Sequence, residues 1–97
     1  MNKRFSTQMS LADAETLALQ VLAFLAEDRP RLGRFLAATG SSAEELQLSA
    51  GEPETLLAVT QYLLEDESLL LVFASGAGIA PEQIGRAYRL LGQQARI

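Results

Sequence analysis

The sequence predicts an all-α protein, an orthogonal bundle of six short helices, and three observations support this fold class. Leucine and alanine account for 33 of the 97 residues, whereas valine and isoleucine together number six. Strong helix formers therefore dominate, and residues that favour strands are rare. Residues typical of helix N-termini precede the apolar segments, and glycine follows several of them. The third observation is an internal repeat.

One part of the sequence recurs 38 residues later. Aligning Leu17–Leu46 with Thr55–Ile84 requires no gap and gives nine identical residues in 30 positions. A chain of this composition would give about two or three identities by chance, so the match indicates a repeated unit. We interpret the chain as two copies of a three-helix unit, over about 11–50 and 51–92.

The first copy is expected to hold helices over about 11–27, 28–40 and 43–50. A left-handed glycine is the preferred residue after a helix, so Gly40 should end the second helix. Pro30 suits the first turn of that helix. The residues that should cap the three N-termini are Ser10, Asp28 and Ser42, the last within the capping-box pattern Ser42-Ala43-Glu44-Glu45.

The second copy should repeat this order, with helices from Pro53, from Asp66 and from Pro81 with Glu82. Gly76 and Gly78 are expected to stop the fifth helix, and the sixth should run to about Gly92.

A single domain is expected over 10–92, with fraying polar tails at 1–9 and 93–97. The apolar stretch at 17–26 recurs at 55–64, so it belongs to the fold rather than to a signal peptide. No apolar run approaches the roughly 18 residues that span a bilayer. The sequence therefore predicts a soluble, cytoplasmic protein with no membrane partner.

The two copies differ in their second helices. Arg29, Arg31 and Arg34 should keep that helix of the first copy at the surface, whereas Leu69–Ala74 of the second copy is apolar all round, which predicts burial. Leu11–Ala26 is apolar at twelve of its sixteen positions and should also be largely covered. Because so short a chain has difficulty surrounding two such helices, we predict a homodimer through helix one or helix five.

Composition argues against catalysis. The chain has no cysteine and no histidine, which excludes disulfides, thiol nucleophiles, zinc ribbons and histidine bases. Its single lysine, Lys3, lies in a tail, so a Ser–Lys dyad is disfavoured. We predict no enzyme activity and no cofactor.

Two acidic dipeptides occupy equivalent helix breaks, Glu27-Asp28 and Glu65-Asp66. Such carboxylates could hold Mg²⁺ or Ca²⁺, which makes a carboxylate–metal enzyme a remote alternative. Helix capping explains both aspartates more simply.

Charge is distributed unevenly, with eight acidic residues and no basic one between Phe35 and Gly85. The arginines indicate a protein that docks a helical surface on a protein partner, because the planar guanidinium group pairs with carboxylates at interfaces. The candidate partner contacts are Arg31, Arg34, Arg86 and Arg89.

A DNA-binding regulator that uses the sixth helix is the alternative, because Arg86 and Arg89 lie three residues apart on it. The net charge of −4 disfavours nucleic acid as a partner. The helix at 43–50, which would read DNA in the first copy, has no basic residue.

Several segments resemble a small bacterial family known as a domain of unknown function. The segments that resemble its first half are Glu15–Gln20, Leu22–Asp28, Leu32–Leu36 and Thr39-Gly40, and those that resemble its second half are Leu63–Phe73 and Pro81–Ile84. The similarity spans about 11–91. It implies a compact helical protein of about this length and brings no activity, cofactor or catalytic residue.

Overall fold

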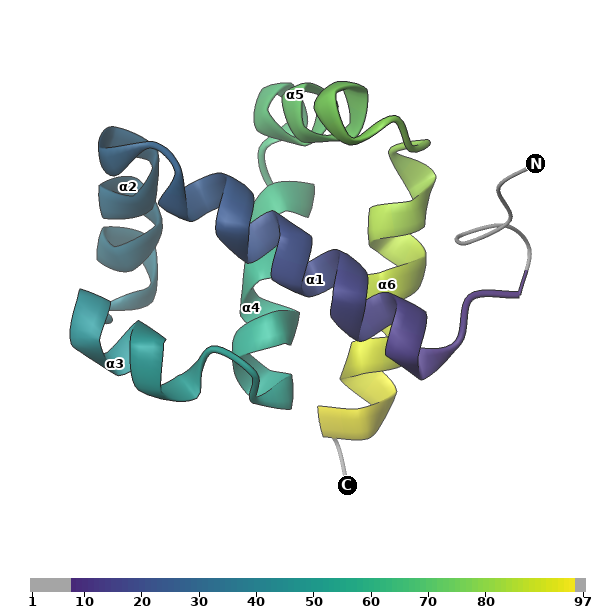
Figure 1. Cartoon of the computed structure of the whole chain (residues 1–97), viewed down its shortest axis with the longest axis horizontal. Helices are drawn as coiled ribbons and strands as arrows, with labels where there is room; N and C mark the ends of the chain where they lie inside the picture. The colour runs from purple at the N-terminus through teal and green to yellow at the C-terminus, as the bar shows by residue number, and fades with distance from the viewer. Residues whose placement is uncertain (1–7, 96–97) are drawn as a thin grey trace.

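The computed structural model describes residues 8–95, and this part of the chain folds into six helices without a strand (Figure 1). The all-α prediction is confirmed. The helices are α1 (Leu11–Ala26), α2 (Arg29–Thr39), α3 (Ala43–Ser49), α4 (Pro53–Leu64), α5 (Glu67–Ala77) and α6 (Glu82–Ala95).

The hydrophobic core lies between α1, α4 and α6, and α1 crosses the other two in Figure 1. The buried apolar side chains of these three helices are Ala14, Leu17, Ala18, Val21, Leu25, Leu56, Val59, Leu63, Ile84, Ala87 and Leu91. The other helices are peripheral. Phe35 from α2 and Phe73 from α5 reach the core, whereas no residue of α3 is buried.

The predicted caps are present at equivalent places in the two halves. Asp28 accepts a hydrogen bond from the Arg31 amide at 2.9 Å, and Asp66 accepts one from the Leu69 amide at 3.1 Å. The glycines that follow α2 and α5, Gly40 and Gly78, both adopt the left-handed conformation with φ 70°. Ser10 and Ser42 complete capping boxes at α1 and α3. Side-chain capping of this kind satisfies amides that have no partner within a helix.

Two helix ends differ from the sequence prediction. Gly76 lies inside α5, because the left-handed residue that ends this helix is Gly78. α6 continues past Gly92 to Ala95, so the predicted tail at 93–97 begins as helix. A side chain at Gly92 would stand 3.7 Å from Leu57 of α4, which shows that the glycine lies close against that helix. The predicted N-terminal tail lies outside the described residues except for 8 and 9.

The prediction that α5 is buried is wrong. Phe73 and Ala74 are buried, but Leu71 is 48% exposed and Val72 is 55% exposed. One side of α5 packs on the molecule, and no described helix covers the other. A chain of about 100 residues has too little material to surround every apolar helix. α1 is also incompletely covered, since Leu19 is 44% exposed.

Aromatic contacts follow the alignment of the two copies. Phe24 of α1 packs edge-on against Phe73 of α5, with 5.3 Å between ring centroids, and Tyr62 of α4 packs edge-on against Phe35 of α2, with 5.2 Å. Phe24 aligns with Tyr62 and Phe35 aligns with Phe73. Each pair therefore joins the first helix of one copy to the second helix of the other. The pseudo-duplicated orthogonal arrangement itself stays a prediction.

Candidate functional site

Arg31, a candidate partner contact, is bound within the molecule. Its guanidinium donates a hydrogen bond from Nη1 to the Phe24 carbonyl oxygen at 2.8 Å, and its Cζ lies 4.0 Å from the centre of the Phe24 ring. The side chain is half-buried. Because Phe24 in turn contacts Phe73, Arg31 connects the start of α2 to α1 and, through Phe24, to α5. This cation–π contact gives Arg31 a structural role.

The other three candidate arginines are exposed but lie on two separate helices. Arg34 is on α2, at the left of Figure 1, and Arg86 and Arg89 are on α6, at the right. The Nη1 atom of Arg89 lies over Gly85, 3.7 Å from the place of an added Cβ. The structure therefore brings Arg86 and Arg89 onto one helix surface but does not join them to Arg34.

The acidic dipeptides act as helix caps. The Asp28 and Asp66 carboxylates accept the amide hydrogen bonds described above, and Glu27 and Glu65 are exposed at the ends of the preceding helices. Within residues 8–95, no group of three or more acidic side chains is arranged to hold a metal ion.

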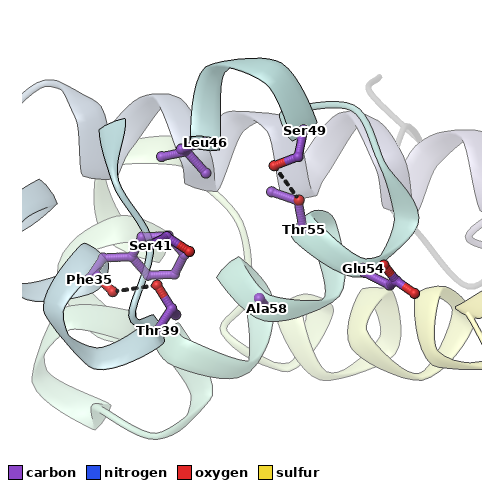
Figure 2. A pocket seen from close by; sticks show the side chains of 8 residues that line it. All are labelled: Phe35, Thr39, Ser41, Leu46, Ser49, Glu54, Thr55 and Ala58. Atoms are coloured by element: carbon purple, nitrogen blue, oxygen red, sulfur yellow. Dashed lines mark hydrogen bonds between the residues drawn. The ribbon is translucent and has the colours of Figure 1, made fainter. Parts of the chain in front are cut away.

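A cavity of about 240 Å³ opens between α2, α3 and α4 (Figure 2). Its lining residues are Phe35, Thr39, Ser41, Leu46, Ser49, Glu54, Thr55 and Ala58. The Thr55 hydroxyl donates to Ser49 Oγ at 2.9 Å on one side, and Thr39 donates to the Phe35 carbonyl at 3.0 Å on the other. The lining is mixed, because Phe35, Leu46 and Ala58 contribute apolar surface and Ser41 and Glu54 contribute polar surface.

The sequence analysis did not identify this cavity. The alignment contains a signal for it, because Ser49 aligns with Ala87 of the second copy and Thr55 aligns with Leu17 of the first, and both of these counterparts are fully buried. Smaller or polar side chains at core-equivalent positions indicate incomplete filling. Serine and threonine are so common on helix surfaces that this signal is clear only with the structure in view.

The exposed side of α5 is the second feature that the sequence analysis missed. Ser68, Leu71, Val72 and Ser75 are exposed and follow the i, i+3, i+4, i+7 spacing of one helix face. We call these four residues the α5 face. It carries two large apolar side chains between two small polar ones and no charge.

No helix within the described part of the chain is both long and apolar enough to cross a membrane.

Comparison with known proteins places the chain in a family. The model of the family described as protein of unknown function (DUF3572) matches residues 11–94, the whole span from α1 almost to the end of α6. Comparisons with curated proteins and with solved structures gave no match. The resemblance noted in the sequence is thus confirmed: the chain belongs to the DUF3572 family of proteins of unknown function.

Proposed function

We propose that this protein is a non-enzymatic interaction protein that docks the α5 face on a protein partner. The observation that carries the proposal is the exposure of Leu71 and Val72, which are 48% and 55% exposed on a helix with few polar residues. Burying such side chains in an interface is favourable by about 25 cal/mol per Å² of apolar surface. The small neighbours Ser68 and Ser75 allow a partner helix to approach closely.

The candidate arginines have a secondary part in this proposal. Arg34, Arg86 and Arg89 are exposed, and the guanidinium groups at these positions add positive charge to the surface that a partner meets. Arg31 contributes less, because it is half-buried against Phe24. Exposed ion pairs contribute about 0.2–1 kcal/mol each, less than a buried apolar anchor. We therefore assign most of the binding energy to Leu71 and Val72.

Site-specific photocrosslinking tests the proposal. A benzophenone amino acid replaces Val72 in the full chain expressed in its native cells, and a matched variant carries it at Gln47, an exposed residue of α3. Discrete adducts from position 72 that are absent or different from position 47 support docking through the α5 face, and an adduct of twice the chain mass identifies the partner as a second copy. An adduct from position 47 alone reports on the region of α3 and does not support docking through the α5 face. The absence of a discrete adduct from position 72 contradicts the proposal.

A regulator that binds DNA through α6 is the second candidate function. The observation in its favour is that Arg86 and Arg89 are both exposed on one stripe of α6, although Glu82 and Gln93 share that stripe. Phosphate contacts would make binding to duplex DNA depend on salt. A gel shift at low salt that is lost in the Arg86→Ala, Arg89→Ala variant supports this function, and no shift at low salt rejects it.

A further inference from the structure

We propose that the cavity between α2, α3 and α4 is a second docking site, which binds a basic amphipathic helix of a partner protein through one apolar anchor side chain. This site is separate from the α5 face. α5 lies at the top of Figure 1, whereas α3 lies at the lower left. The two proposals therefore succeed or fail independently.

The alignment of the two copies indicates which residues correspond to those of the cavity. In the 38-residue alignment, Leu46 and Ser49 of α3 correspond to Ile84 and Ala87 of α6, which are fully buried in the core. Leu46 and Ser49 instead line the cavity and are half-buried. By this alignment α3, with 7 residues, corresponds to only the beginning of α6, which has 14.

The first half has no counterpart of Leu91. This leucine is fully buried in the last turns of α6 and aligns with Pro53, where α4 and the second copy have already begun. Leu57 of α4 shows the same contrast, since it is half-buried beside Gly92 of α6, whereas the aligned Leu19 of α1 is 44% exposed. The first half therefore has no counterpart of the last turns of α6, and we infer that a helix of a partner takes that place.

The size of the cavity indicates the kind of occupant. Small-molecule sites occupy roughly 300–1,000 Å³, and this cavity of about 240 Å³ is smaller and open to solvent. Its volume suits one large apolar side chain, and interfaces typically draw much of their binding energy from such anchors. Leu46 and Ala58 are half-buried and contribute apolar surface that such a side chain can contact.

The charge around the cavity indicates which charge an occupant should carry. Glu54 lines the cavity, Glu52 precedes α4, and Glu44 and Glu45 lie in the first turn of α3. All four are exposed, and the sequence has no basic residue between Phe35 and Gly85. An occupant that carries lysine or arginine beside its apolar anchor complements this rim, which favours correct orientation and fast association.

Nuclear magnetic resonance of the isotope-labelled full chain tests the proposal with a helical probe. The probe is a synthetic peptide of residues 82–95 with Glu82→Lys, which combines the anchor Leu91 with a basic face. We expect saturable shifts at Thr39, Leu46, Ser49 and Thr55, with a Kd below about 1 mM. Replacing Leu91 by Asp in the peptide should weaken binding at least tenfold.

The protein variant Ser49→Ala, Thr55→Leu replaces each of these two residues by its aligned counterpart, Ala87 and Leu17, and should also weaken binding at least tenfold. Glu54→Gln should weaken it about two- to fivefold. No saturable shift of the cavity residues overturns the proposal, as do shifts confined to α5 or spread through the α1–α4–α6 core. Concentration-dependent shifts of the cavity residues without peptide assign the cavity to a second copy instead and overturn it too.

Discussion

The two halves of the molecule are built alike through their first two helices and differ in the third. α2 and α5 start after a capping aspartate, end before a left-handed glycine and carry one inward phenylalanine each. The third helices diverge, because α6 contributes three buried side chains to the core and α3 contributes none. α6 covers the core, whereas the shorter α3 leaves a cavity and an acidic rim between α2, α3 and α4.

The largest expected effect is a difference in stability loss between matched substitutions in α6 and in α3, the third helices of the two halves. Ile84→Ala should lower the free energy of unfolding by about 2–5 kcal/mol, because the residue is fully buried. Leu46→Ala, at the aligned position on α3, should cost about 1 kcal/mol because that side chain is half-buried. Urea unfolding monitored by circular dichroism measures both. Equal losses would contradict the contrast between α6 and α3.

The glycines that follow α2 and α5 test whether the two halves end their second helices in the same way. Gly40→Ala and Gly78→Ala should each cost about 1–2 kcal/mol, because an L side chain is strained at φ 70°. Gly76→Ala should instead stabilise the protein by up to about 1 kcal/mol, because it lies within α5 and an added Cβ would have no described atom within 4 Å. Thermal unfolding distinguishes these outcomes. A loss at Gly76 equal to that at Gly78 would mean that α5 ends at Gly76.

Substitution of the two capping aspartates should lower the stability of the protein by similar amounts. Asp28→Ala and Asp66→Ala should each reduce the free energy of unfolding by about 1 kcal/mol, because each removes one side-chain bond to an otherwise unpaired amide. The controls Asp28→Asn and Asp66→Asn keep an acceptor and should retain most of the stability. Chemical denaturation gives all four values. A loss in only one half would show that the caps are not equivalent.

The smallest expected effect is the coupling within the two aromatic pairs. Double-mutant cycles with leucine at Phe24 and Phe73, and at Phe35 and Tyr62, should each give a coupling of about 0.5–1.5 kcal/mol, since both are edge-to-face contacts. The measurement is the free energy of unfolding of each single and double variant. Coupling in one pair and none in the other would show that the two aromatic contacts are not equivalent.

Local signals predicted the helices well. Ser10, Asp28 and Ser42 each cap through a hydrogen bond to an amide three residues on, so the evidence for these starts lies within a few residues of sequence. Helix ends were harder to predict. Gly76 and Gly78 are close together at the end of α5, and the sequence does not indicate which of them adopts the left-handed conformation.

Features that depend on contacts between distant segments could not be predicted. The burial of α5 depends on how many helices surround it, which an apolar pattern does not specify. The packing of Arg31 on Phe24 depends on the angle at which the chain turns between α1 and α2. The cavity depends on Ser49 and Thr55 meeting across the connection between α3 and α4, and neither residue differs locally from ordinary surface residues.

The most direct test is the free energy of unfolding of the Ser49→Ala, Thr55→Leu variant, which gives the cavity the aligned core residues Ala87 and Leu17 of the other copy. Both partners of one hydrogen bond are removed together, and apolar volume enters an open space. The account predicts a gain of about 0.5–2 kcal/mol, as for other cavity-filling substitutions. A loss of more than about 1 kcal/mol, as expected for an overpacked site, would contradict it.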